Sequence, residues 1–243
     1  MIEFESLNVF RSNVQTFVDT FRLVDSAIDK FNAEEMPVIK QSSEFETPTS
    51  TDDENFEKLR EFAQHLGRYL TVKQAVAWQN GWYVVMMVTI TEAYLRDTLA
   101  EAGKYDSSFM KNSEQSLTYH DVCNADSIEL LSFRMRDTWA KSFVETGGPK
   151  RWFEKLRRWG AKDLTDQLLL DLERMWGIRH VMVHRAGKID SDFLSRHSDF
   201  SADKTGNVVV ASDDVGDLTM SAIDFAKAVN AYLVNRCTAN TKA

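Results

Sequence analysis

The sequence predicts an all-α fold, and three observations support this prediction. Glycine and proline, the residues that most often interrupt helices, number only 10 and 3 among 243 residues. Apolar residues recur at spacings of three and four over long segments, which is the period of one helix face. Hydrophobic residues make up 43% of the chain, which is enough for the core of one large domain.

The first predicted helix carries an uninterrupted apolar seam. Its positions alternate spacings of three and four: Leu7, Phe10, Val14, Phe17, Phe21, Val24, Ile28 and Phe31. Such a seam packs either on a second copy or on the rest of the same chain, and its four phenylalanines favour the second alternative. Residues 41–55 are polar and contain five acids, so we interpret them as a linker. We therefore expect an N-terminal extension over residues 1–55 and a helical domain over 56–243.

The helical domain is expected to contain a long, buried helix and several shorter ones. A capping box at Thr51 and Glu54 predicts one helix as far as Leu70, and an apolar helix follows from about Val72 to Ala102, where Gly103 ends it. Further helices are predicted from Asp126, over 150–159, over 164–186 and around 218–233, with a strand at 206–212 as half of a short β-hairpin.

Charge and cysteine content exclude some classes of protein. Lys and Arg total 29 and Asp and Glu total 37, giving a net charge of -8 that argues against non-specific coating of nucleic acid but permits a local basic cleft. The two cysteines form no CxxC pair, so a reducing, cytoplasmic location is expected. The densest apolar run, residues 82–90, is shorter than the roughly 20 residues that cross a bilayer, so no membrane partner is expected.

The stretch WGIRHVMVHRAG, residues 176–187, concentrates groups that can act on a phosphate. His180 and His184 are four residues apart and therefore share a helix face, with Arg179 adjacent. A neutral imidazole exchanges protons near pH 7, and an arginine offers a fork of donors that fits a phosphate. Two other interpretations remain: a zinc site, which lacks a glutamate at Val181 and an obvious third ligand, and charge complementation of the helix dipole by His184 and Arg185.

The segment IRHVMVHRAG resembles the signature of the HEPN superfamily. In that signature an arginine precedes a histidine by four to six residues near the end of a core helix, a polar residue follows the arginine, and a glycine follows the histidine. The upstream segment YVVMMVTITEAYLRDTL is similar to the family's central helix, with Glu92, Tyr94 and Leu95 after an apolar run. The resemblance covers roughly residues 57–235 in element order. Arg185 departs from it, because many relatives have asparagine there.

This resemblance implies an HEPN-like helical bundle and an RNA-cleaving activity. Many HEPN domains are endoribonucleases that need no metal cofactor, act as homodimers with a composite cleft, and belong to toxin–antitoxin or phage-defence systems. By that resemblance His184 is the general acid or base, Arg179 holds the scissile phosphate, and His180 assists. An antitoxin or a nucleotidyltransferase-type protein is an expected partner. The alternatives are a catalytically inactive HEPN-like module that binds a nucleotide or a protein, and a purely structural dimer.

Two further features could serve such a site. Glu92 lies in the apolar middle of its helix and needs a donor, so it could orient Arg179 or a histidine. Glu173 is a weaker candidate for this role. The segment KRWFEKLRRW places Arg151, Lys155 and Arg158 on one helix face, where they could bind the RNA backbone. Alternatively, this helix is an ordinary amphipathic one with buried aromatics.

His120 and Cys123 have the spacing of a ligand pair but no partner pair, and we interpret them as structural.

Overall fold

A computed structural model of the chain describes residues 4–43, 53–111, 116–197 and 200–240. Within these ranges the fold is all-α with one small hairpin, as the sequence predicts. In chain order the elements are α1 (Glu5–Ser43), α2 (Asp53–Tyr105), the 3-10 helix η1 (Ser107–Met110), α3 (Tyr119–Cys123), α4 (Ile128–Glu145), α5 (Gly148–Trp159), α6 (Asp166–His184), α7 (Ser191–Arg196), β1 (Ser201–Ala202), β2 (Val208–Val209) and α8 (Ser212–Asn240).

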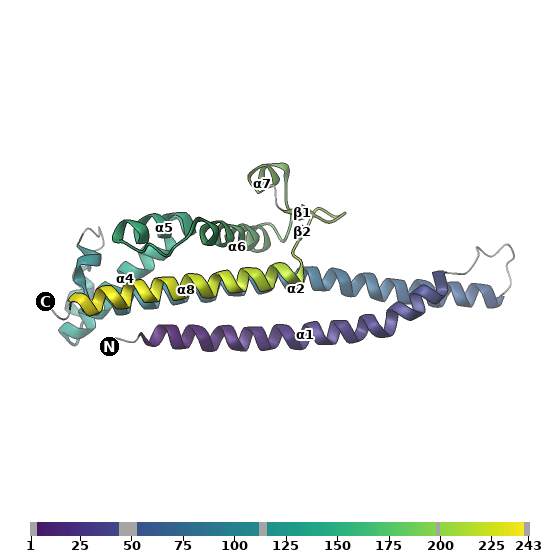
Figure 1. Ribbon diagram of the computed structural model, residues 1–243, viewed down its shortest axis with the longest axis horizontal. Coiled ribbons are helices and arrows are strands. Elements are labelled where there is room, and N and C mark those ends of the chain that lie inside the picture. Colours follow the sequence, from purple (N-terminus) through teal and green to yellow (C-terminus); the bar gives the residue numbers. More distant parts are fainter. Residues whose placement is uncertain (1–3, 44–52, 112–115, 198–199, 241–243) are drawn as a thin grey trace.

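The apolar seam of α1 packs against α2 within the same chain. Phe10, Val14 and Phe17 are buried. The Phe10 ring lies 4.8 Å from the ring of Tyr94, measured between centroids, and the Phe17 ring lies 5.1 Å from that of Tyr83. Figure 1 shows α1 running beside α2 for most of its length. This seam therefore contributes to the core of one chain, and burial of its aromatic rings stabilises that packing.

Helix α2 is longer than the sequence predicts. We expected a break between Leu70 and Val72, but the helix continues from Asp53 to Tyr105. The Thr71 hydroxyl donates a hydrogen bond to the Gly67 carbonyl one turn earlier, at 2.8 Å, a bond that a helical residue makes without interrupting the helix. Gly103 lies within the last turns and does not end the helix. The predicted capping residue Thr51 lies outside the described residues.

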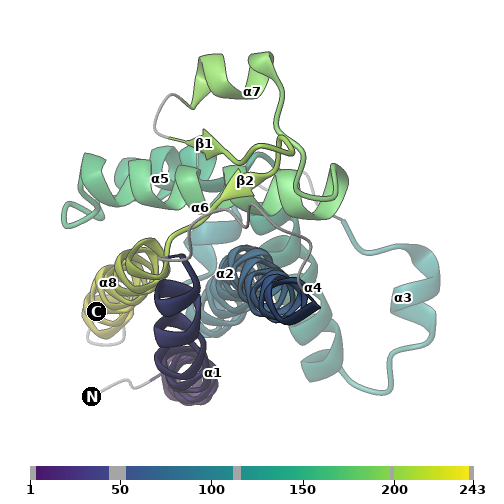
Figure 2. The ribbon, with the colours of Figure 1, turned by 90° about the vertical axis from the view of Figure 1, so that its right-hand side faces the viewer.

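Helices α5 and α6 form a second layer over α2 and α8, and α4 packs beside α2, as Figures 1 and 2 show. One buried cluster joins α1, the middle of α2, the second half of α6, the hairpin and the first half of α8. Another joins the end of α2, α4, α5, the first half of α6 and the second half of α8. Trp176 on α6 packs against both clusters, so it sits at the junction of the two parts of the core.

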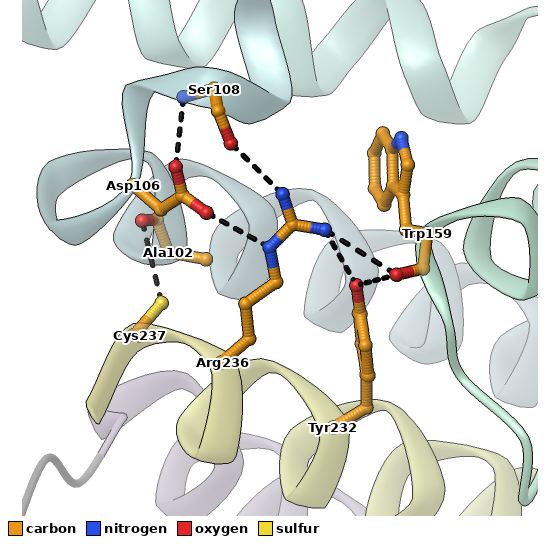
Figure 3. Close-up of polar contacts among 7 residues, drawn as sticks. All are labelled: Ala102, Asp106, Ser108, Trp159, Tyr232, Arg236 and Cys237. Carbon is orange, nitrogen blue, oxygen red and sulfur yellow. Dashed lines mark hydrogen bonds and ion pairs between the residues drawn. The ribbon is translucent and has the colours of Figure 1, made fainter. Parts of the chain in front are cut away.

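A polar network fastens the end of α8 to its neighbours (Figure 3). The Arg236 guanidinium donates to Asp106 at 2.9 Å, to the Ser108 hydroxyl at 2.9 Å and to the Tyr232 hydroxyl at 2.8 Å. Tyr232 in turn donates to the Trp159 carbonyl at 2.7 Å. Burial alone would raise the pKa of Asp106, but hydrogen bonds from Ser108 and Arg236 lower it below its usual value. The network joins the ends of α2, α5 and α8.

The hairpin closes the end of α6. Strands β1 and β2 are antiparallel, with Ser201 opposite Val209. The Val208 backbone N–H donates to the Gly187 carbonyl at 2.8 Å, and the Ile189 N–H donates to the Gly206 carbonyl at 3.0 Å. The residues that follow α6 are thereby held in place. In the part of the chain that the structure describes, no helix is both long and apolar enough to cross a membrane.

Candidate functional site

Helix α6 positions the motif residues by burying one face. Thr165 caps its first turn, since the Thr165 side chain accepts a hydrogen bond from the Leu168 N–H. Ile178, Val181 and Met182 are buried. Gly81 lets α2 approach closely, because a Cβ added there would lie 2.7 Å from the Met182 sulfur. The opposite face of α6 therefore faces outward with Arg179, His180 and His184 on it or at its edge.

Arg179 lies beside Glu92, as the sequence suggested. One Arg179 guanidinium nitrogen is 3.9 Å from a Glu92 carboxylate oxygen, and the two side chains are 35% and 27% exposed. At this distance the two groups form an ion pair, but they are too far apart for an ordinary hydrogen bond. Glu92 is the carboxylate that pairs with Arg179 among the described residues, which favours it over Glu173 for the orienting role.

The two histidines lie side by side on the surface. The ring centroids of His180 and His184 are 5.1 Å apart, and the planes are inclined by 46°. Both histidines are exposed, whereas Arg179, which pairs with Glu92 of α2, is half-buried. An exposed imidazole pair next to a guanidinium offers proton transfer and anion binding on one surface. The structure thus brings together the four residues predicted as catalytic.

Glu92 has an unusual environment for a carboxylate. Burial raises its pKa above the usual value, the Arg179 charge lowers it, the Glu145 charge raises it, and a hydrogen bond from the Trp176 indole lowers it; the net direction is upward. Burial therefore outweighs the nearby cation. Carboxyl groups whose pKa is perturbed in this way cluster at functional sites, although structural ion pairs share the property.

The backbone after His184 ends helix α6 with a left-handed turn at Gly187, where the sequence predicts the helix to end. Ala186 and Gly187 have φ of 49° and 80°, in the left-handed region that favours glycine. The backbone N–H groups of Arg185 and Gly187 both donate to the Val181 carbonyl at 3.0 Å, which satisfies an acceptor at the helix end. The Arg185 side chain pairs with Asp190, which gives Arg185 a structural role at this helix end.

The other arginine–histidine pairs with matching spacing occupy different surroundings. Arg174, six residues before His180, pairs with Asp214 of α8 at 3.0 Å, and its guanidinium carbon lies 5.5 Å from the centroid of the Phe200 ring. Arg174 is thus turned toward α8 and the hairpin. Arg60 and His65 lie in the first part of α2, far in sequence from the residues that contact α6.

The basic helix α5 is partly structural. Trp152 and Leu156 are fully buried, so these apolar residues belong to the core. Arg151 and Arg158 are exposed and Lys155 is half-buried. Burial lowers the pKa of Lys155, and the charges of Arg151 and Arg158 lower it further, so the three cations lie close together.

The first residues of α5 lie between Arg151 of the basic face and Trp176 of the motif helix. A Cβ added at Gly147 would clash with the Arg151 side chain, and one added at Gly148 would lie 3.7 Å from the Trp176 ring. Trp176 in turn donates to Glu92 and packs edge-on against Trp152, with 4.8 Å between ring centroids. The α4–α5 junction therefore lies between Arg151 and the Arg179–Glu92 pair.

Sequence reasoning missed two residues that shape this site. Trp176 opens the motif stretch, but only the fold shows that its indole reaches Glu92 and borders both core clusters. Gly81 lies in an apolar run of α2, and a glycine within a predicted helix was the available signal for a close helix contact.

His120 and the two cysteines lie on other elements than the motif helix α6. His120 and Cys123 lie in the short helix α3, where both are exposed. Cys123 and Cys237 are free thiols, and only Cys237 is buried. Across residues 4–240, leaving out the gaps, no group of three or more His, Cys, Asp or Glu side chains is arranged to hold a metal ion.

Exposed apolar side chains lie on the two helices that carry the site. On α2, Trp82 and Met86 are 47% and 51% exposed, and on α6 Val183 is 46% exposed. Trp82 and Met86 are one turn apart and share a face, and Val183 precedes His184 directly. We refer to these three residues as the apolar border of the site.

No protein-family model matches the chain, and no curated protein or solved structure is significantly similar to it. The HEPN resemblance accordingly rests on the residues of the chain itself.

Proposed function

We propose that the protein is a metal-independent endoribonuclease that cleaves RNA at the exposed end of α6. The observation that carries this proposal is the grouping of His180 and His184, with rings 5.1 Å apart, beside an arginine that is paired with a half-buried carboxylate. These are the groups that cleavage by a ribose 2′-hydroxyl requires: a base, an acid and a cation for the phosphate.

In the proposed reaction the 2′-oxygen attacks the adjacent phosphorus, and the bond to the 5′-oxygen of the next nucleotide breaks. One imidazole removes the 2′-hydroxyl proton, and another gives a proton to the leaving 5′-oxygen. Arg179 binds the non-bridging oxygens and stabilises the charge that develops on them. The products are a 2′,3′-cyclic phosphate and a 5′-hydroxyl, so neither water nor a metal ion enters this step.

We further propose that two copies of the chain form the complete site. One motif supplies one arginine and two neighbouring imidazoles on a single exposed surface, whereas the reaction needs groups on both sides of the phosphate. The apolar border of the site, Trp82, Met86 and Val183, is suited to burial against a second copy. A role in a toxin or phage-defence system, with an antitoxin or nucleotidyltransferase-type partner, rests on the HEPN resemblance alone.

The chain provides its own control for testing this proposal. Wild-type protein and the variants Arg179→Ala, His184→Ala and His65→Ala would be incubated with labelled total RNA in EDTA. His65 follows Arg60 at the same spacing but lies in another part of α2. Because a positioned acid or base contributes about 100-fold to 10,000-fold, His184→Ala should lose detectable cleavage while His65→Ala keeps it. Equal cleavage by all four proteins would contradict the assignment.

If no protein cleaves RNA, the binding-module alternative gains weight. That alternative predicts that Arg179→Ala weakens the binding of RNA or a nucleotide although no product forms.

A further inference from the structure

Two side chains of α6 reach the same carboxylate on α2. Trp176 and Arg179 are three residues apart, so they follow one another on one face of the helix. The Arg179 guanidinium lies 3.9 Å from a Glu92 carboxylate oxygen, and the Trp176 indole N–H donates a hydrogen bond to the same carboxylate. Helix α6 therefore holds Glu92 with a cation and with a neutral donor.

The two partners of Glu92 orient it to different degrees. The ion pair with Arg179 is too long for an ordinary hydrogen bond, so it fixes the direction of the carboxylate only loosely. An indole has a single N–H donor and no acceptor, and it bonds along one direction. The hydrogen bond from Trp176 therefore orients the carboxylate more narrowly than the ion pair does.

The indole of Trp176 is itself fixed by its neighbours. Its ring packs edge-on against the buried Trp152, with 4.8 Å between the ring centroids and 88° between the planes. The backbone at Gly148 passes beside the indole, since a Cβ added there would lie 3.9 Å from the indole nitrogen. Trp176 also packs against both core clusters. Because rotation of the ring would break these contacts, its N–H keeps a fixed direction.

The hydrogen bond from Trp176 also opposes protonation of Glu92. Burial raises the pKa of Glu92, and the charge of Glu145 at the end of α4 raises it further. The Arg179 charge and the Trp176 hydrogen bond lower this pKa. A neutral Glu92 would no longer attract the guanidinium, so Trp176 supports the charge that pairs with Arg179.

From these contacts we propose that Trp176 is a positioning residue of the site: its indole N–H holds the Glu92 carboxylate in place to pair with Arg179. Trp176 touches no reacting atom in the proposed reaction and acts through Glu92 and Arg179. Its effect on cleavage rests on the proposed ribonuclease function, whereas its hold on Glu92 does not. The two can therefore be measured separately.

Removal of the indole N–H tests this role. Trp176→Phe keeps an aromatic ring without the donor, and β-(3-benzothienyl)alanine inserted at position 176 keeps the two-ring shape with sulfur in place of N–H. Trp139→Phe is the matched control, because Trp139 is a buried tryptophan that packs against Phe109 and Phe143. Carbon-13 NMR titration follows the Glu92 carboxyl group, whose signal is identified by its loss in Glu92→Gln. Circular dichroism shows whether each variant folds.

We expect the pKa of Glu92 to be higher in both position-176 variants than in the wild type, because the hydrogen bond that lowers it is lost. Trp139→Phe should leave this pKa unchanged. On the acidic side of the pH profile, RNA cleavage by the position-176 variants should decline at a higher pH, since Arg179 loses its charged partner there. At neutral pH, kcat should fall about tenfold and KM should change less than about twofold, because Arg179 stabilises charge that develops in the transition state.

An unchanged Glu92 titration in a folded position-176 variant would overturn the proposal, and so would an equal shift in Trp139→Phe. A shifted titration with unchanged kcat and an unchanged pH profile would also overturn it, because Glu92 would then not position Arg179 for cleavage. If the wild type cleaves no RNA, the ribonuclease proposal fails, and the NMR titration still decides whether Trp176 holds Glu92.

Discussion

Glu92, which we propose orients Arg179, carries a cost to the fold. Its pKa is raised because burial outweighs the Arg179 charge, so the carboxylate is less favourable in the folded chain than in the unfolded one. A group with a raised folded pKa stabilises the fold below its unfolded pKa, and this contribution is lost as the pH rises through the folded pKa. At neutral pH the ionised Glu92 therefore lowers the stability of the fold.

This linkage predicts the behaviour of Glu92→Gln. At pH 7 the free energy of unfolding of the variant should equal or exceed that of the wild type, because the cost of burying the charge disappears. The variant should also lack the stability that the wild type gains as the pH falls through the raised pKa of Glu92. Urea unfolding at several pH values measures both effects. RNA cleavage by this variant should nevertheless fall, since Arg179 loses its partner. A large loss of stability at pH 7 with unchanged cleavage would show that Glu92 is a purely structural residue.

At the scale of elements, α5 combines a core role with a basic surface. Its buried Trp152 and Leu156 explain why the helix is amphipathic, so its cations need not bind anything. The test is therefore a change of charge that leaves the aromatics in place. Arg151 and Arg158 are exposed and suit this purpose, while Lys155 is half-buried with its ammonium 4.7 Å from the centroid of the Phe143 ring.

Replacing Arg151 and Arg158 by glutamine should weaken RNA binding and reduce its salt dependence. If both contact phosphates of a single strand, the slope of log K against log salt concentration should become shallower by about 1.4. Fluorescence anisotropy with labelled RNA at several salt concentrations measures this slope. A double variant of exposed lysines on other helices, Lys104→Gln with Lys227→Gln, is the matched control. Equal effects of the two pairs would mean that α5 does not form a specific RNA surface.

The elements also show what the sequence could and could not predict. Apolar periodicity predicted the all-α fold, and local signals such as Gly187 predicted the hairpin and the end of α6. It split α2 near Thr71, although no helix-breaking residue lies there. The Arg179–Glu92 pair was predictable because an acid within an apolar run of a helix needs a donor. The contact of Trp176 with Glu92 and the Asp106–Arg236 network join residues far apart in sequence, and no local pattern predicts them.

For the whole molecule, self-association is expected to determine activity. The apolar border of the site combines Trp82, Met86 and Val183 on two packed helices. In the proposed reaction two motifs face each other across a dimer interface. The chain also exposes Leu23 and Leu70 on α1 and α2, outside this border. Variants of Trp82 and Met86 can therefore be compared with matched variants of Leu23 and Leu70.

Trp82→Glu combined with Met86→Glu should convert a dimer into a monomer and abolish cleavage, because charges cannot be buried in such an interface without partners. Leu23→Glu combined with Leu70→Glu should leave both properties unchanged. Light scattering coupled to size-exclusion chromatography gives the mass, and the RNA assay gives the activity. An active monomer in the Trp82/Met86 variant would disprove the composite site.

The central claim, that α6 ends in a metal-independent ribonuclease site, is tested most directly by the chemistry of the new RNA ends. Wild-type protein in EDTA should produce 2′,3′-cyclic phosphates and 5′-hydroxyls, and His184→Ala should produce neither. Mass spectrometry of a short cleaved oligonucleotide identifies both groups. Ends that carry a 3′-hydroxyl and a 5′-phosphate, or cyclic phosphates formed equally well by His184→Ala, would contradict the account.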